Sequence, residues 1–421
     1  MEFKEYNLNN IVNIISGGTP KRSISEYWNG DIPWLSVKDF NDNNRLVKNS
    51  SEFITVLGLN NSSTHVLEKG DIILSARGTV GCLAQVSKPM AFNQSCFGLR
   101  AKDEIISNEY LYYLLKYNLN NIRNKVHGSV FDTINRETFT KIKVSVPNKK
   151  KQKIISDILL YIDDKIDINN SMILNLEQIS QTLFKRWFID FEFPNEDGKP
   201  YKSSGGEMVE SELGEIPKGW EVIQFGDITE IQNGFAFRAD DYVSNGIKVI
   251  RTVNISKSDI TIDNETVYLP ESYSHSIKFE KYKLKQFDTL LVMVGGSIGN
   301  TGIIFSYNTP ALQNQNQWRM RSKNINISSV LIFYYTNYIN DRVSGWKSGS
   351  AREFYRKDTF NKFNIAIPNL ETIECLDKIL VANFEKMDLL HKEINILKEL
   401  RDTLLPKLLS GEIEIPEDLE V

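Results

Sequence analysis

The sequence has few cysteines and no long apolar run. Its three cysteines are Cys82, Cys96 and Cys375, which lie far apart and form no CxxC pair. The first residues, MEFKEYNLNN, contain neither the basic nor the apolar segment of a secretion signal. No apolar run approaches the roughly 20 residues that a membrane helix needs. We therefore expect a reduced, cytoplasmic protein that does not span a membrane.

The sequence also lacks the common catalytic motifs. It contains no GxxxxGK[ST] phosphate loop, no HExxH cluster and no Asn-Pro dipeptide, so an NPPY-type amino-methylation motif is absent. Its four histidines, which we expect to be structural or solvated, are His65, His127, His275 and His391. GGSIG at 295–299 resembles a nucleotide loop, but its counterpart RGTVG at 77–81 lies between strand-like runs, which favours a hairpin turn. No set of residues indicates an enzyme acting by itself.

The composition is that of an ordinary globular protein. Hydrophobic residues make up 41% and charged residues 25% of the 421 residues, a length that suits two or three domains. The formal net charge of −4 at pH 7 argues against a protein held to nucleic acid by bulk positive charge. A local basic face is still compatible with this total, so charge alone does not identify the partner.

One motif occurs twice, about half a chain apart. TFTKIKVSVPN at 138–148 returns 221 residues later as TFNKFNIAIPN at 359–369. Upstream matches are Ser107 with Ser328, at the same shift, and Asp71 with Asp288, at a shift of 217. In each half, strand-like runs flank a Gly-rich turn, a helix begins at the serine, and a strand of period two ends at a proline. We therefore expect each half to form a mixed α/β domain.

A heptad pattern follows each half. From Pro147 to about Asp190 no Pro or Gly occurs, and apolar residues recur at alternating steps of four and three; the pattern returns 221 residues later in the same register. Neither stripe can be buried alone, so we expect two helices of about 40 residues that pack antiparallel on each other. The residues that we assign to this coiled coil or to a subunit interface are Ile162, Ile166, Ile173, Leu176, Leu183, Trp187, Phe188, Met387, Leu390, Ile394, Leu397, Leu404 and Leu408.

The predicted fold class is α+β, with two mixed α/β domains related by an internal repeat and joined by an antiparallel coiled coil. The stretch between the first helix and the second domain is rich in Gly, Ser, Pro and acids, which is typical of a linker. The predicted boundaries are 1–147 for the first domain, 148–190 for the first helix, 191–217 for the linker, 218–368 for the second domain, 369–410 for the second helix and 411–421 for a tail.

Several loops carry side chains of the kind that recognise base edges. FNQSCFGLR at 92–100 aligns with QNQNQWRMR at 313–321. Asn and Gln can donate to and accept from adenine together, and Arg can donate twice to guanine. Amides that only satisfy backbone groups of a loop explain the same residues equally well. The candidate DNA-binding residues are Lys21, Arg22, Arg77, Asn93, Gln94, Ser129, Arg238, Arg251, Asn314, Gln315, Ser350 and Arg352.

The whole chain resembles the specificity subunit of a type I restriction-modification system. The motifs that carry this resemblance are LFKRWFIDFEFP at 183–194, which ends the first helix, and LRDTLLPKLLSGEIEI at 400–415, which ends the second. The resemblance implies two target recognition domains, each of which reads one half of a split sequence in double-stranded DNA. Trp187 and Phe188 are then either part of the coiled-coil core or a dock for a partner, or both.

The resemblance also implies the partners and the cofactors. Two methylation subunits would bind around the helices, and restriction subunits would join them. S-adenosylmethionine, ATP and magnesium are expected on these partners, and this chain is expected to bind no cofactor and no metal and to be non-catalytic. Two other classes are open to test: a coiled-coil scaffold without DNA recognition, and a self-sufficient methyltransferase or nuclease.

Overall fold

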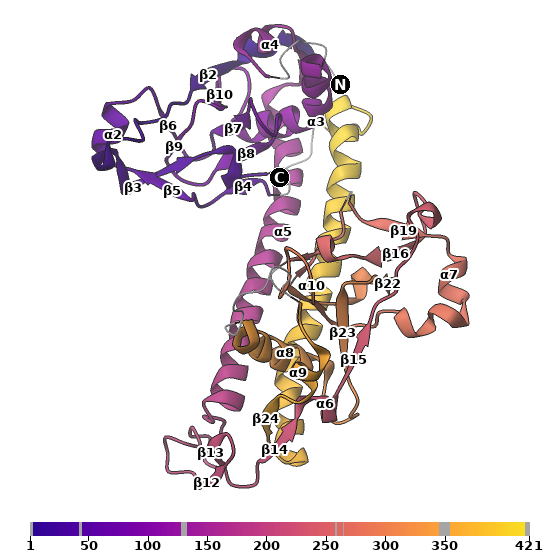
Figure 1. The fold of residues 1–421 in the computed structure, drawn as a ribbon. Helices are drawn as coiled ribbons and strands as arrows, with labels where there is room; N and C mark the ends of the chain where they lie inside the picture. The colour runs from indigo at the N-terminus through magenta and orange to yellow at the C-terminus, as the bar shows by residue number, and fades with distance from the viewer. Residues whose placement is uncertain are drawn as a thin grey trace. The chain divides into compact units, whose positions relative to one another are not determined.

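The computed structural model describes residues 3–41, 44–127, 133–256, 259–263, 265–344 and 354–416. The chain forms two compact units, which we describe separately (Figure 1). Unit 1 comprises residues 1–169 and 394–421, and unit 2 comprises residues 170–393. Each unit therefore contains one repeat together with a part of both long helices.

Unit 1 contains two main sheets. The five-stranded sheet has the order β2 (Val12–Ser16), β10 (Cys96–Ala101), β7 (Ile72–Ser75), β8 (Leu83–Val86) and β4 (Leu46–Val47). The four-stranded sheet has the order β5 (Glu52–Ile54), β3 (Trp28–Leu35), β9 (Met90–Phe92) and β6 (Val66–Leu67). A further pair joins β1 (Lys4–Asn7) to β11 (Lys143–Val146), and the helices are α1 (Leu8–Ile11), α2 (Val56–Asn60), α3 (Asn108–His127) and α4 (Arg136–Thr140).

Unit 2 repeats most of this plan. Its four-stranded sheet has the order β15 (Thr229–Asn233), β23 (Gln317–Ser322), β20 (Thr289–Val292) and β21 (Thr301–Ile303). Its three-stranded sheet has the order β19 (Val267–Leu269), β16 (Ile247–Ile250) and β22 (Ala311–Gln313). The remaining elements include the pair β14 (Glu221–Gln224) and β24 (Asn364–Ile367), the short pair β17 (Ile255–Ser256) and β18 (Asp259–Ile260), and the helices α6 (Phe225–Ile228), α7 (Ser272–His275), α8 (Ser329–Ser344) and α9 (Lys357–Asn361).

The repeat that the sequence predicts is confirmed at the elements on which the prediction was based. Ser107 Oγ accepts a hydrogen bond from Tyr110 N at 3.2 Å at the start of α3, and Ser328 Oγ accepts one from Leu331 N at 3.1 Å at the start of α8. The two Gly-rich segments are hairpin turns, because β7 pairs antiparallel with β8 and β20 with β21. The period-two strands β11 and β24 end one residue before their prolines.

An ion pair between a buried aspartate and a partly exposed arginine is repeated together with the strands. Asp71 and Asp288, whose side chains are both 1% exposed, accept hydrogen bonds from Arg100 and Arg321 on the neighbouring strand at 2.6 Å from Nη2. Each aspartate also accepts a backbone hydrogen bond from three residues upstream, at 2.8 and 2.7 Å. A buried carboxylate needs such partners, so each pair holds the tight turn before β7 or β20 against the next strand.

The two long helices are α5 (Lys149–Phe184), which continues as a π-helical turn at Lys185–Ile189, and α10 (Leu370–Ser410). All the residues that we assigned to the coiled coil are buried or half-buried. In unit 1 the N-terminal part of α5 shares one core with the C-terminal part of α10, through Ile155, Leu159, Leu405 and Leu408. The heptad pattern is thus confirmed, and its apolar stripe is covered by the antiparallel partner helix.

The segment predicted as a linker is more ordered than its composition indicates. It contains a hairpin of β12 (Met208–Ser211) and β13 (Gly214–Pro217), closed by a hydrogen bond from Ser211 Oγ to Gly214 O at 2.6 Å. Upstream of the hairpin, the Phe193 ring stacks on Trp220 with 5.4 Å between ring centres. Composition missed this order because a few aromatic rings supply the burial that the Gly and Ser residues lack.

A buried polar layer joins the helices inside unit 1. Arg401 Nη1 of α10 donates to Asp163 Oδ1 of α5 at 2.9 Å, and Tyr113 of α3 donates to Asp163 Oδ2 at 2.7 Å. All three side chains are buried. Burial and the Asp163 carboxylate raise the pKa of Tyr113 well above its ordinary value, so the phenol stays protonated and donates. In unit 2 the equivalent of Asp163 is Phe384, so this charged layer belongs to one repeat only.

We expect Arg401→Met to lower the free energy of unfolding by about 3–5 kcal/mol, because it leaves the Asp163 carboxylate buried without a charge partner. Adding Asp163→Asn should restore part of this loss. The urea midpoint of the purified chain measures both effects.

The matched control is Lys378→Met, which breaks an exposed i,i+4 pair with Glu374 on the same helix and should change stability by less than about 1 kcal/mol. Equal midpoints for Arg401→Met and Lys378→Met would show that the buried layer contributes nothing.

Candidate nucleic-acid interface

In each unit, two parallel strands end at the same edge of a sheet. In unit 1, β3 pairs parallel with β9, and Asn93 N donates to Leu35 O at 2.9 Å directly after the paired residues. In unit 2, β16 pairs parallel with β22, and Asn314 N donates to Ile250 O at 3.1 Å. The carboxyl ends of the strands therefore hold equivalent loops, 93–95 and 314–316, at equivalent edges.

A glycine brings a second loop against each of these edges. A Cβ on Gly17 would lie 2.1 Å from Asn93 O, and a Cβ on Gly234 would lie 1.7 Å from Asn314 O, so no other residue fits without a shift of the backbone. The backbone of the next residue is bound as well: Gly18 N donates to Phe92 O at 2.9 Å, and Phe235 N donates to Gln313 O at 3.2 Å. The loop after β2 and the loop after β15 are thus held by the same contacts.

The Gly-rich hairpin is the third part of each edge. Ala76 N and Arg77 N both donate to Ser95 O, at 2.8 and 3.2 Å, and in unit 2 Met293 N donates to Asn316 O at 3.1 Å. Three segments that are far apart in the sequence therefore meet twice, once per unit. We call these two sites the first and the second loop edge, formed by residues 17–22, 76–81 and 93–95 and by residues 234–239, 293–299 and 314–316.

The structure brings most of the predicted DNA-binding residues to these edges. The exposed ones are Lys21, Arg22, Arg77, Gln94, Arg238 and Gln315. Arg251 directly follows β16, where it is half-buried and donates from Nη2 to Glu265 O. The candidates Ser129, Ser350 and Arg352 lie outside the described residues.

The two asparagines shape their loops. Asn314 is 6% exposed; its Nδ2 donates to the Tyr242 hydroxyl at 3.3 Å, and its Oδ1 accepts from Gln315 N at 2.6 Å. Asn93 Oδ1 accepts from Ser95 N at 3.1 Å. The amide next in sequence is exposed in both loops, and Gln94 also accepts a hydrogen bond from Thr19 of the glycine-containing loop. The exposed glutamines are therefore better placed than the asparagines to reach a ligand.

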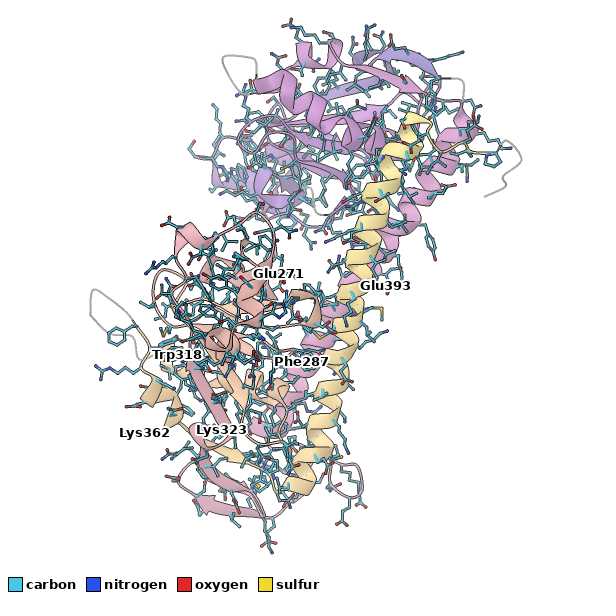
Figure 2. All side chains as sticks on the ribbon, turned by 90° about the vertical axis from the view of Figure 1, so that its right-hand side faces the viewer. Glu271, Phe287, Trp318, Lys323, Lys362 and Glu393 are labelled. Carbon is cyan, nitrogen blue, oxygen red and sulfur yellow. The ribbon has the colours of Figure 1, made fainter. Side chains whose placement is uncertain are left out.

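The support beneath the two edges differs. In unit 1 the two residues that flank loop 93–95 are Phe92 and Cys96, and both are buried. In unit 2 the equivalent positions are the buried Gln313 and Gln317, and Gln313 Nε2 donates to Gln317 O at 3.0 Å across the loop. Just beyond, the two units agree: Trp318 (labelled in Figure 2) packs edge-on against Phe360 at 5.5 Å between ring centres, as Phe97 does against Phe139 at 5.6 Å. Sequence reasoning missed these supporting residues, although the alignment of Phe92 with Gln313 marks the difference.

Two aromatic residues at the end of α5 are packed inside unit 2. Trp187 and Phe188 are buried, and the Phe188 ring lies 6.0 Å from Tyr335 of α8 and 6.1 Å from Trp220. Just upstream, Phe184 stacks on Tyr334 at 5.2 Å. These rings fix the end of α5 to the second repeat.

Comparison with known proteins shows what this duplicated arrangement corresponds to. The family model described as "Type I restriction modification DNA specificity domain" matches twice, at residues 1–178 and 217–401. The chain belongs to this family.

Individual relatives of this specificity-domain family cover nearly the whole chain. The type I restriction enzyme MjaIX specificity subunit of Methanocaldococcus jannaschii is 28% identical over 420 residues, 97% of this chain and 93% of the relative. The HindI specificity subunit of Haemophilus influenzae is 24% identical over 479 residues, 98% of this chain and all of the relative. A crystal structure of the S subunit from M. genitalium shares the fold, with a TM-score of 0.60, 15% identity and coverage of 97% of this chain and 96% of that one.

Among the described residues, no three His, Cys, Asp or Glu side chains are grouped so that they could hold a metal ion. Among the helices of those same residues, none combines the length and the apolarity of a membrane span.

The structure separates the roles of two neighbouring residues in the second loop edge. We expect Gln315→Ala to weaken binding to the preferred DNA duplex by about 1–3 kcal/mol without a change in the urea midpoint, because the side chain is exposed. Asn314→Ala should lower stability by about 1 kcal/mol, because it removes two loop hydrogen bonds.

Binding of the duplex is measured by titration, with every variant prepared in the same way as the unaltered chain. Glu215→Ala, which changes an exposed side chain of β13 in the same unit, is the control and should alter neither quantity. If Gln315→Ala leaves affinity and sequence preference unchanged, the loop has only a structural role.

Proposed function

We propose that this chain is the DNA sequence-recognition subunit of a type I restriction-modification complex, in which each repeat reads one half of a bipartite target. The observation that carries the proposal is the loop edge, which the fold builds twice with the same backbone contacts. The membership of both repeats in a DNA specificity-domain family supports it.

Differences between the two edges support two different half-sites. The loops carry Asn93 and Gln94 in one repeat and Asn314 and Gln315 in the other, but the residues that follow diverge, from SC to NQ. The glycine-containing loops diverge as well, with Lys21 and Arg22 in one and Arg238 and Ala239 in the other. Because base contacts depend on side-chain identity and not on the backbone, one fold used twice reads two sequences.

We further propose that the chemistry belongs to partner subunits. Two methylation subunits would carry S-adenosylmethionine, and restriction subunits would use ATP and magnesium, while this chain is non-catalytic. The relatives are named as specificity subunits of restriction enzymes, which fits this division.

The long helices offer a surface for these partners. Large apolar side chains remain exposed on α5 and α10, including Leu174 at 64% and Ile396 at 65% exposure. Exposed apolar patches on a helix are typical of protein interfaces. We therefore propose that the methylation subunits bind to the outer faces of the helices, and that the inner faces form the coiled coil.

The test is a selection of duplexes from random sequence by the chain co-purified with its methylation subunits. We expect two short fixed sequences separated by a gap of constant length, and methylation within them when S-adenosylmethionine is present. The chain alone should transfer no methyl group.

Two results would contradict this function. A complex without any sequence preference would indicate a scaffold, and methylation or cleavage by the chain alone would indicate a self-sufficient enzyme. Glu196→Gln, at an exposed position that belongs to neither loop edge and to neither long helix, is the control and should select the same sequence as the unaltered chain.

A further inference from the structure

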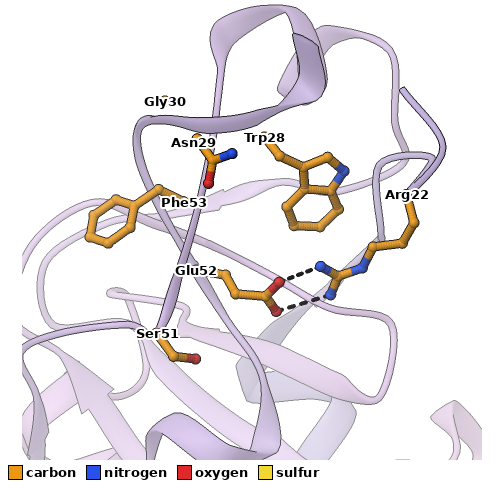
Figure 3. Close-up of a pocket in the computed structure, with 7 residues that line it drawn as sticks. All are labelled: Arg22, Trp28, Asn29, Gly30, Ser51, Glu52 and Phe53. Atoms are coloured by element: carbon orange, nitrogen blue, oxygen red, sulfur yellow. Dashed lines mark hydrogen bonds and ion pairs between the residues drawn. The ribbon is translucent and has the colours of Figure 1, made fainter. Parts of the chain in front are cut away.

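A polar pocket next to the first loop edge holds an arginine in one fixed orientation. The pocket has a volume of about 430 Å³ and is lined by Arg22, Trp28, Asn29, Gly30, Ser51, Glu52 and Phe53 (Figure 3). It lies where the loop after β2 meets the antiparallel strands β3 and β5. Its arginine is one of the candidate DNA-binding residues, and its other lining residues come from unit 1 as well.

Two contacts fix the guanidinium of Arg22. Its two terminal nitrogens both donate to the Glu52 carboxylate, with 2.9 Å between Nη2 and Oε2, and its carbon lies 3.9 Å from the centre of the Trp28 ring. The Trp28 ring is itself held edge-on by Trp34 at 5.2 Å, and its Nε1 donates to Lys21 O at 3.3 Å. A planar ion pair on an aromatic face loses little side-chain freedom when it binds a ligand.

This arrangement leaves one edge of the guanidinium unused. The carboxylate occupies the edge formed by the two terminal nitrogens, so the edge formed by Nε–H and the second N–H of Nη2 keeps two parallel donors. Among the described residues no hydrogen-bond acceptor for this edge is recorded. The Arg22 side chain is 56% exposed, which leaves the edge accessible.

The charge of the pair favours a base over a phosphate. Glu52 neutralises Arg22, and the Arg22 hydrogen bonds and charge lower the pKa of Glu52, which keeps the carboxylate ionised. A neutral pair gains little from a phosphate anion, whereas two parallel donors match the O6 and N7 acceptors of guanine in the major groove. Lys21, one residue earlier and exposed, has no recorded acid partner among the described residues and retains the chemistry of a phosphate contact.

We propose that Arg22 reads a guanine in the half-site of the first repeat, and that Glu52 and Trp28 are positioning residues that preset its free edge. This inference rests on the proposed function. The alignment of Gly17 with Gly234 places Ala239 opposite Arg22, so the second repeat lacks this guanine contact. The inference therefore assigns one position of one half-site to one side chain.

The experiment uses the complex of the full chain with its methylation subunits and the duplex that it prefers. Each guanine of the target is replaced in turn by 7-deazaguanine, which lacks the N7 acceptor. We expect one replacement, in one half-site, to weaken binding by about 5-fold, because it removes one of the two acceptors of a bidentate contact whose usual total is about 1–3 kcal/mol.

Variants identify the side chain behind this effect. Arg22→Ala, which removes both donors, should bind the normal target at least as weakly as the unaltered complex binds the replaced one, and the same replacement should cause no further loss. Glu52→Gln should reduce the discrimination at this position while total affinity for unrelated DNA stays equal or rises, because a negative charge is removed. If Glu52 has only a structural role, Glu52→Gln should lower both the discrimination at this position and the affinity for unrelated DNA.

Lys21→Ala is the matched control and should weaken binding to all sequences alike, with a smaller salt dependence. If Arg22→Ala behaves in the same way, or if every 7-deazaguanine replacement acts equally on the variant and the unaltered complex, Arg22 does not read guanine. If the unaltered complex selects no bipartite target at all, the proposed function fails, and this inference fails with it.

Discussion

Both units depend on the apolar seam between α5 and α10. Each helix has a stripe of Ile, Leu and Met residues that would be exposed if the helix were alone, and an isolated helix of this kind is marginal in water. The partner helix covers the stripe, and within unit 1 the same core extends through α3 to the sheet. The loops that carry the candidate base contacts thus rest on a framework whose stability comes from packing and does not depend on loop sequence.

This separation of framework and loops explains how the repeat can diverge in one place and not in another. The capping serines, the buried Asp71 and Asp288 with their arginines, and the glycines 17 and 234 are equivalent because backbone geometry demands them. Backbone geometry does not restrict the side chains on the loop edges in this way. Beneath the second loop edge the buried residues are polar: Gln313 and Gln317 occupy the positions that Phe92 and Cys96 occupy in the first repeat.

The charged side chains also differ between the framework, where the carboxylates are buried, and the first loop edge, where the ion pair is exposed. The buried ions include the carboxylates that close the turns before β7 and β20 and the Asp163–Arg401 pair between the helices, and hydrogen bonds join each of these carboxylates to an arginine. On the first loop edge the Arg22 and Glu52 pair is exposed, so a ligand can reach it. A chain with net charge −4 can therefore still present a few placed hydrogen-bond donors at an exposed edge.

The sequence by itself determined the repeat, the two long helices, the hairpin turns and the helix caps. These features depend on periodicity and on local hydrogen bonds, which a short window of residues contains. It also indicated the loops of the candidate site, because Asn, Gln and Arg gather at matching places in the two halves. Only the tertiary structure decided which of these side chains are exposed: Asn314 is bound to Tyr242, a residue 72 positions earlier, while Gln315 is exposed. The pairing of Arg22 with Glu52 and the order of the segment after α5 likewise depend on contacts between distant residues, and no local pattern contains them.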